Sequence, residues 1–374
     1  LMMKVDQYDE IHFTTYYKYG DFVKSSIKKC IISSLKKKQK YIELDSWNFL
    51  IIDLEGDAED AKNLFQCITN SINQLLNDKK QKIYFSIAAG AIELSKEFYS
   101  YDRVLECLNF SLNRAEGFNG NKFYLFDMQH YIRLKRKEEI LKHIYWAINH
   151  DFEGFELYYQ PIIDINTKSI ITLEALLRLK MKDEYIQPKE FISLLEQTHL
   201  ILPVGRWVLK TAMESWKELQ QLIPGLKMNV NMSFVQVNQN NSVQMIIDII
   251  KEIDTTLLGI EITETGELNS NQYYNFCIGL EKGKRALILD DYGSGFSNVH
   301  RLTAAKPQYI KIDHSFTKHI IKSDYYRKIL KNTITDVIKS LGADYMQGCL
   351  FARPMDKHSF IKNHKRMSEN FLNN

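Results

Sequence analysis

The chain has little of what marks a disulfide-bonded, zinc-binding or membrane-spanning protein. Its five cysteines are odd in number, widely scattered and without a C-x-x-C pair: Cys30, Cys67, Cys107, Cys277 and Cys349. This pattern excludes a disulfide framework or a zinc module and favours reduced and mostly buried thiols in a cytoplasmic protein. No apolar run approaches the roughly 18 residues that a membrane span needs. The first residues lack the apolar core of a signal peptide.

Excess charge of either sign is also absent. The 49 Lys and Arg residues nearly balance the 46 Asp and Glu residues, which leaves a formal net charge of +3. This balance gives no general attraction to nucleic acid or to an anionic membrane, so we expect no nucleic-acid polymer as a partner. The basic cluster within residues 133–137 is typical of the solvated face of a helix, because no aromatic residues or binding motif accompany it.

Composition and length predict a globular chain of two domains. The apolar share is 45% and the charged share 25%, which excludes fibrous and disordered proteins. A length of 374 residues suits two domains of ordinary size.

The N-terminal part, residues 1–127, alternates helical periodicity with short apolar runs. Apolar residues three and four apart predict helices, and compact β-rich runs predict strands. The predicted helices cover residues 22–35, 58–76 and 104–115, and the predicted strands lie within 47–54, 83–94 and 117–127. This mixture favours a small α+β domain. A charged stretch with apolar residues at helical spacing follows and predicts a linker helix over residues 128–150.

From residue 151 to residue 374 one pattern recurs. A short apolar run ends in polar residues, and a longer helical stretch follows it, as in IITLEALLR, KMNVNMS, LLGIEITE, ALILDD, YIKID and ADYMQG. Continuous apolar runs that alternate with helices are typical of buried parallel strands in βαβ units. Several units in series favour a (β/α)8-type, TIM-like barrel, whose active site lies at the C-terminal ends of the strands.

The polar residues at those strand ends form the candidate site. They are Glu174, Asn231, Glu261 with Glu264, Asp290 with Asp291, Lys311 with Asp313, and Gln347. If the strand ends converge on one mouth, several carboxylates share one pocket and cannot all stay ionised without compensating charge. Carboxylate and amide oxygens without His or Cys favour Mg²⁺ or Mn²⁺. Such a cluster suits a two-metal site for phosphodiester hydrolysis, with Lys311 adding positive charge near the attacking water or the phosphoryl oxygens.

Six ordered motifs resemble the EAL domains, which are cyclic-di-GMP phosphodiesterases. The segment YYQPIIDINTKSIITLEALLRLK contains Glu174-Ala175-Leu176 and is similar to the opening of that family. The other motifs are NVNMS, IEITET, DDYGSGFSN, KIDHSF and QGCLFARP. The resemblance covers roughly residues 151–360 and implies hydrolysis of cyclic-di-GMP to linear pGpG in bacterial signalling. It also implies a homodimer formed through this domain.

The resemblance assigns roles to individual residues. The metal ligands would be Glu174, Asn231, Glu261, Asp290 and Asp291, with Glu264 as the alternate to Glu261. The catalytic residues would be Glu174, Asp291, Lys311 and Gln347. The substrate-binding residues would be Gln160, Pro161, Leu176, Arg178, Asp313 and Pro354, with Arg178 contacting phosphate.

One departure from the family pattern leaves two functions open. The family has an EGVE-like strand end between KID and QG, but only 36 residues separate Lys311 from Gln347, and no such segment lies there. Either residues of the natural chain are missing near Val337 and Ile338, or the barrel is degenerate. In the second case a cyclic-di-GMP receptor without hydrolysis replaces the enzyme as the leading hypothesis. A scaffold that binds neither metal nor nucleotide is the third hypothesis, disfavoured because unpaired buried polar groups are costly.

The N-terminal part resembles an eroded GGDEF domain, the diguanylate cyclase family. The signature position reads Asp45-Ser46-Trp47-Asn48-Phe49, so both glycines are gone, and we expect the tight turn that admits a nucleotide to be lost. Asp6 stands where the family keeps a metal-binding aspartate, and Lys36 and Gln39 replace the Arg-x-x-Asp motif. We expect no cyclase activity from this domain and a structural or regulatory role instead.

Overall fold

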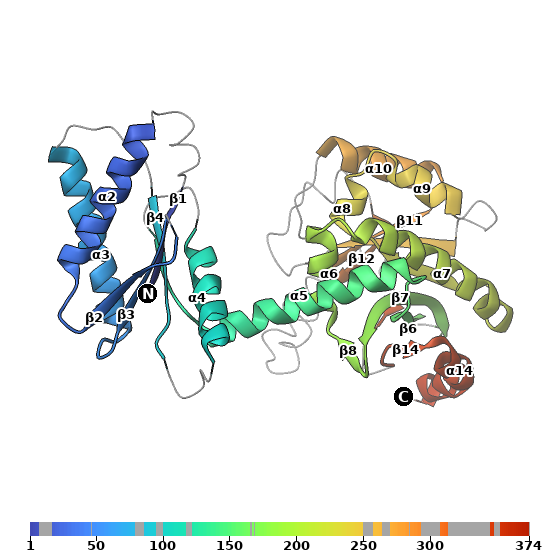
Figure 1. Cartoon of the computed structure of the whole chain (residues 1–374). Helices are drawn as coiled ribbons and strands as arrows, with labels where there is room; N and C mark the ends of the chain where they lie inside the picture. The colour runs from blue at the N-terminus through green and yellow to red at the C-terminus, as the bar shows by residue number, and fades with distance from the viewer. Residues whose placement is uncertain are drawn as a thin grey trace, which may run out of the picture. The chain divides into compact units, whose positions relative to one another are not determined.

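Two units of the chain, Leu1–Arg136 and Lys137–Asn374, fold around separate cores (Figure 1). The computed structural model describes residues 1–6, 17–45, 47–78, 86–94, 100–116, 122–164, 167, 169–249, 257–263, 270–283, 285–292, 307–312, 345–347 and 352–373. Within these ranges, no helix is both long enough and apolar enough to cross a membrane.

The first unit is built on a five-stranded sheet in the order β2-β3-β1-β4-β5. The strands are β1 (Met2–Asp6), β2 (Gln39–Glu43), β3 (Asn48–Asp53), β4 (Ser86–Ala91) and β5 (Lys122–Leu125). Helices α2 (Tyr17–Ser34) and α3 (Ala58–Asp78) lie on one face, and α4 (Tyr101–Ala115) lies on the other (Figure 1). The three predicted helices are present as α2, α3 and α4, and the three predicted strands as β3, β4 and β5, whereas β1 and β2 escaped prediction. The unit is therefore a three-layer α+β fold.

The two faces of this sheet carry different cores because side chains alternate along a strand. Phe49 and Ile51 of β3 pack with Ile27, Ile31 and Ile68 of the helices α2 and α3. On the opposite face, Leu50 belongs with Leu108 and Leu112 of α4 to a smaller cluster.

The eroded signature lies at the turn between β2 and β3. The main-chain N–H of Leu44 donates to the carbonyl of Asn48 at 2.9 Å, so a turn is present although the glycines are absent. Oδ1 of Asp45 accepts from the main-chain N–H groups of Trp47 and Asn48, at 2.8 and 2.9 Å. An Asp side chain thus closes a turn here in place of glycine, and the expected loss of nucleotide access stays a prediction. Asp6 ends β1, paired with Ser86.

Helix α5 (Met128–Asn149) covers the stretch predicted as a linker helix, and the boundary between the two units falls inside it. Its later residues Ile140, Ile144 and Ala147 are fully buried in the core of the second unit.

The second unit has a nine-stranded sheet whose central path runs β12-β11-β10-β9-β7-β6-β13. Strands β7 (Ile170–Met181), β9 (Lys227–Asn231), β10 (Leu258–Thr263), β11 (Ala286–Tyr292) and β12 (Tyr309–Ile312) are parallel neighbours. Strand β6 (Phe155–Asp164) pairs antiparallel with β7, and β8 (Glu184–Ile186) extends this hairpin. Strands β13 (Tyr345–Met346) and β14 (Met355–Asp356) pair with β6.

Helices separate the parallel strands from β7 to β11, as the sequence predicts. They are α6 (Pro188–Gln197), α7 (Ile201–Leu222), α8 (Phe234–Val237), α9 (Ser242–Ile249) and α10 (Ser270–Lys282), and the C-terminal α14 (Lys357–Asn373) follows β14. The two ends of the sheet path approach each other. The ring centres of Tyr309 in β12 and Tyr345 in β13 lie 5.6 Å apart. The predicted α/β, TIM-like fold is confirmed. The stretch in which the EGVE-like strand is missing lies outside the described residues.

The turn at Asp45 yields a first prediction. Asp45→Ala removes the acceptor of two main-chain hydrogen bonds and should lower the free energy of unfolding by about 1 kcal/mol. Asp45→Asn keeps an acceptor oxygen for the two main-chain donors but loses the hydrogen bond that Nδ2 of Asn48 donates to Oδ2, so its stability should lie between those of Asp45→Ala and wild type. Urea unfolding followed by circular dichroism makes the comparison, and equal stability of the two variants would contradict this role.

Candidate active site

The predicted strand ends bring their polar side chains together on one side of the sheet. Glu174 lies in β7, Glu261 in β10 and Asp290 in β11, while Asn231 ends β9. The parallel register pairs Glu261 with Asn231, whereas Asp290 pairs with Thr263, two residues further along β10. Glu174 pairs with Asn229, two residues before Asn231, so the polar residues of neighbouring strands are staggered by at most two positions. Lys311 reaches the same space from β12.

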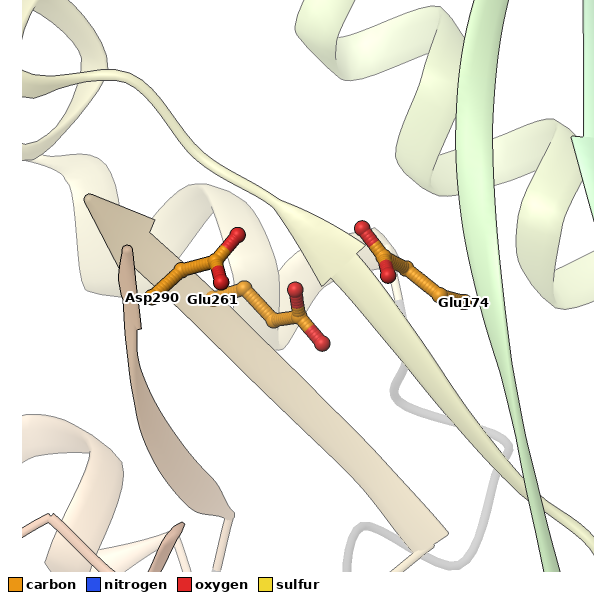
Figure 2. Close-up of side chains that lie close together, drawn as sticks. All are labelled: Glu174, Glu261 and Asp290. Carbon is orange, nitrogen blue, oxygen red and sulfur yellow. The ribbon is translucent and has the colours of Figure 1, made fainter. Parts of the chain in front are cut away.

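Three carboxylates form the centre of the site. One oxygen from each of Glu174, Glu261 and Asp290 lies within 4.8 Å of the other two, and Figure 2 shows the carboxyl groups turned toward a common space. Glu174 is 4% exposed and Glu261 is fully buried. Buried like charges at this separation require a compensating cation.

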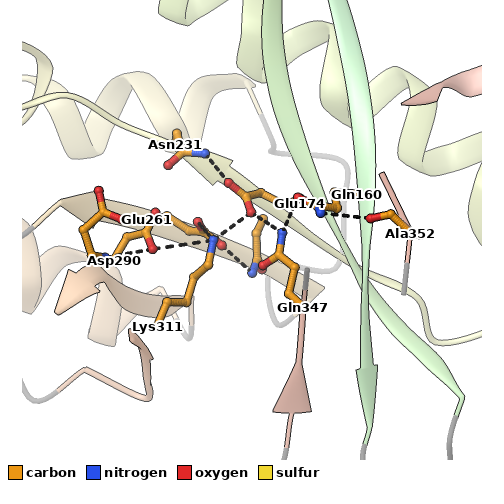
Figure 3. Close-up of polar contacts among 10 residues, drawn as sticks. Gln160, Glu174, Asn231, Glu261, Asp290, Lys311, Gln347 and Ala352 are labelled. Carbon is orange, nitrogen blue, oxygen red and sulfur yellow. Dashed lines mark hydrogen bonds and ion pairs between the residues drawn. The ribbon is translucent and has the colours of Figure 1, made fainter. Parts of the chain in front are cut away.

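The ammonium group of Lys311 supplies positive charge to all three. Its Nζ lies 2.7 Å from Oε2 of Glu174, 2.7 Å from Oε2 of Glu261 and 3.7 Å from Oδ1 of Asp290 (Figure 3). Burial alone would lower the pKa of Lys311, but the negative charges of the three carboxylates raise it well above its usual value. Lys311 therefore stays charged at neutral pH.

The carboxylates differ in their affinity for protons. Burial and the charge of Glu174 raise the pKa of Glu261 to about 8. Burial also acts on Glu174, but the charge of Lys311 and hydrogen bonds from three side chains outweigh it and lower the pKa of Glu174. The pKa of Asp290 is raised, chiefly by burial. In the metal-free protein Glu174 is thus the more acidic partner of Lys311, and Glu261 takes up a proton more readily.

A chain of amides fixes Glu174 from the other side (Figure 3). Asn231 Nδ2 donates to Oε1 of Glu174 at 2.7 Å, and Gln347 Nε2 donates to Oε2 at 2.6 Å. Gln347 also donates to Oε1 of Gln160 at 3.1 Å, and Gln160 donates to the carbonyl of Ala352 at 3.0 Å. Since Asn231 uses its amide nitrogen here, its carbonyl oxygen is the atom that could ligate a metal.

The predicted ligand Asp291 does not join the carboxylate group that the described acidic residues form. It follows Asp290 directly, at the point where the pairing of β11 with β12 shifts register. Its φ of 53° places it in the left-handed region, which is uncommon for a residue other than glycine. Its main-chain N–H donates to Oδ1 of Asp290 at 2.9 Å, so Asp291 here orients its neighbour.

The predicted substrate residues separate into two groups along the β6–β7 hairpin. Gln160 pairs with Glu174, so the alternation places Leu176 and Arg178 on the same face as that carboxylate. Arg178 is half-buried, with Cζ 5.3 Å from the ring centre of Tyr158. Pro161 pairs with Leu173 on the opposite face and points away from the carboxylates.

Three further positions complete the account of the predicted residues. Pro354 is half-buried and stands directly before β14. Asp313 and Glu264 lie outside the described residues.

The structure adds one polar residue that the motifs did not predict. Asn229 is 7% exposed, and its Nδ2 donates to Oε1 of Glu261 at 2.8 Å. A sequence signal existed, because Asn229 stands two residues before Asn231 on the same strand and so on the same face.

Comparison with known proteins shows which family the chain belongs to. A family model described as EAL domain matches residues 147–343, more than half of the chain. The chain belongs to the EAL domain family. Gln347 and Pro354 lie beyond the matched range.

Curated relatives of this EAL chain are longer proteins. The chain is 31% identical over 261 residues to the probable cyclic di-GMP phosphodiesterase PdeI of Escherichia coli, covering 62% of the chain and 33% of that protein. It is 25% identical over 352 residues to the oxygen sensor protein DosP of Escherichia coli, covering 91% of the chain and 43% of that protein. The chain thus spans only a third to less than half of these relatives.

Solved structures of EAL proteins share the fold. A structure titled as the PaMucR phosphodiesterase in complex with c-di-GMP matches with a TM-score of 0.52 and 23% identity, over 59% of this chain and 99% of that one. The EAL enzyme Bd1971, bound to cAMP and cyclic-di-GMP, matches with a TM-score of 0.55 and 20% identity, over 85% of this chain and 81% of that one.

The charge balance of the EAL site yields a stability prediction. Lys311→Met leaves three carboxylates around an uncharged side chain and should cost about 3–5 kcal/mol in the metal-free protein. Lys357 offers a matched control, because its ion pair with Glu218 lies at the surface, and Lys357→Met should cost about 1 kcal/mol or less. Urea unfolding in the presence of a chelator measures both, and equal losses would show that Lys311 does not balance the cluster.

The raised pKa of Glu261 yields a prediction about metal binding. Below a pH of about 8 a proton occupies Glu261 and competes with a cation, so Mn²⁺ affinity should rise as the pH approaches that value. Calorimetry in buffers of different ionisation enthalpy should detect proton release on binding. Glu261→Gln should remove most of this pH dependence. Binding by the wild-type protein without proton release would be the contrary result.

Proposed function

We propose that the EAL unit hydrolyses cyclic-di-GMP to linear pGpG with Mg²⁺ or Mn²⁺. The observation that carries this proposal is the convergence of Glu174, Glu261 and Asp290 on one space beside Lys311. Relatives named as cyclic di-GMP phosphodiesterases and neighbours solved with that nucleotide support the substrate.

The donor set fits a hard divalent cation. The three carboxylates and the carbonyl oxygen of Asn231 offer oxygen ligands alone, which suits Mg²⁺ or Mn²⁺ better than a metal that prefers nitrogen or sulfur. The buried cluster carries more negative charge than Lys311 balances, so it attracts further positive charge. Metal ions bound there would lower the pKa of a water molecule and stabilise charge on phosphoryl oxygens.

The chain's own residues orient the phosphodiester. Lys311 has a raised pKa and lies among the carboxylates, where its positive charge would stabilise negative charge that develops on a bound phosphoryl oxygen. Gln347 fixes Oε2 of Glu174 through its amide nitrogen. Arg178, on the same face of β7 and braced by the ring of Tyr158, is placed to bind a phosphate.

The first unit takes a different part in this proposal. Its eroded signature turn keeps a single acidic residue, Asp45, and the carboxylate of that residue is occupied by the main chain of its own turn. We therefore propose a structural or regulatory role and no cyclase activity. The GGDEF-like origin of this unit, a homodimer through the EAL unit and a cytoplasmic location stay predictions.

The direct test is an assay of the purified chain with cyclic-di-GMP and Mn²⁺. Wild-type protein should release pGpG. Loss of a residue that supports a metal ligand lowers activity by up to roughly 100-fold, so Glu174→Gln, which removes a proposed ligand itself, should lower the rate of hydrolysis by more than that. Lys357→Met serves as the control, because it lies outside the site and should retain activity. Tight binding of the nucleotide without pGpG would replace the enzyme with a receptor, and absence of both would leave a scaffold.

A further inference from the structure

The buried amide of Asn229 lies on β9, next to the strands that carry Glu174 and Glu261. It occupies β9 two residues before Asn231, and the register places it between Glu174 on β7 and Gly259 on β10. Only 7% of its surface is exposed. A buried amide costs free energy unless it is hydrogen-bonded, and the hydrogen bond that the structure shows for its Nδ2 goes to Oε1 of Glu261 at 2.8 Å.

The neighbouring strand is shaped to receive this amide. A Cβ atom at Gly259 would lie 2.4 Å from Oδ1 of Asn229 and 2.6 Å from Cδ1 of Ile288. Such separations are too short for real contacts, so a larger residue at position 259 would push Asn229 aside. The absence of a side chain at Gly259 and the amide at Asn229 therefore form one arrangement across β9 and β10.

The two oxygens of Glu261 are held by different partners. Oε1 accepts from Asn229 inside the sheet, whereas Oε2 accepts from Lys311 at 2.7 Å in the carboxylate cluster. Rotation of the carboxyl group away from this plane would break the hydrogen bond to Asn229. The amide thus fixes the plane in which the carboxyl group of Glu261 faces the shared space.

We propose that Asn229 is a positioning residue that holds Glu261 in the orientation needed to ligate a metal ion, with Gly259 providing the space. The proposal deepens the proposed function, since it rests on the metal site but not on hydrolysis. Residues that hydrogen-bond a metal ligand fix its orientation, and their loss costs about 10–100-fold in metal affinity. Asn229 does not touch the metal or the substrate in this account.

The test is Mn²⁺ binding by calorimetry, with stability measured in parallel. Asn229→Leu keeps a similar volume but removes the donor, and its Mn²⁺ affinity should fall about 10–100-fold. Val230→Ala is the matched control, because Val230 is a buried neighbour on the same strand that faces the opposite side. It should lower stability while leaving Mn²⁺ affinity unchanged.

Gly259→Ala provides a second variant that removes no polar group. It should displace Asn229 and weaken Mn²⁺ binding in the same direction, even if Asn229→Leu fails to fold. Unchanged affinity in either folded variant, or an equal loss in Val230→Ala, would overturn the positioning role. A wild-type protein that binds Mn²⁺ but forms no pGpG would refute the proposed function alone, and the loss of affinity in Asn229→Leu would still support the positioning role.

Discussion

The charge balance between Lys311 and three buried carboxylates is the constraint on which the EAL unit depends. Glu174, Glu261 and Asp290 come from β7, β10 and β11, and Lys311 comes from β12. One ion-pair cluster therefore ties together strands that are far apart in the sequence. One lysine cannot neutralise three ionised carboxylates, so the cluster can carry excess negative charge. A bound metal ion would neutralise that excess.

Amide groups hold the carboxylates in place around this cluster. Asn231 and Gln347 donate to Glu174, and Asn229 donates to Glu261. Gln160 extends the chain of hydrogen bonds to the main chain at Ala352. Groups that are fixed before a ligand arrives need no rearrangement when charge develops, which is how a site of this kind gains catalytic power. The amides also make the site sensitive to residues that never touch a metal.

Much of the site was predictable because parallel strands place their C-terminal ends on one side of a sheet. Glu174, Asn231, Glu261, Asp290 and Lys311 could therefore be grouped from spacing and apolar runs alone. Other features depend on local backbone detail that spacing does not carry. The left-handed φ at Asp291 falls where the pairing of β11 with β12 shifts register, and the turn at Asp45 depends on a side chain that replaces glycine. The role of Asn229 required the register between β9 and β10.

Crystals of the chain soaked in Mn²⁺ provide the most direct test of the central claim, because anomalous scattering locates the metal without reference to activity. The account predicts a peak bonded to oxygen atoms of Glu174, Glu261 and Asp290, with the ammonium group of Lys311 displaced from its position between them. Manganese bound elsewhere on the EAL unit, with the contacts of Lys311 to all three carboxylates intact, would contradict it.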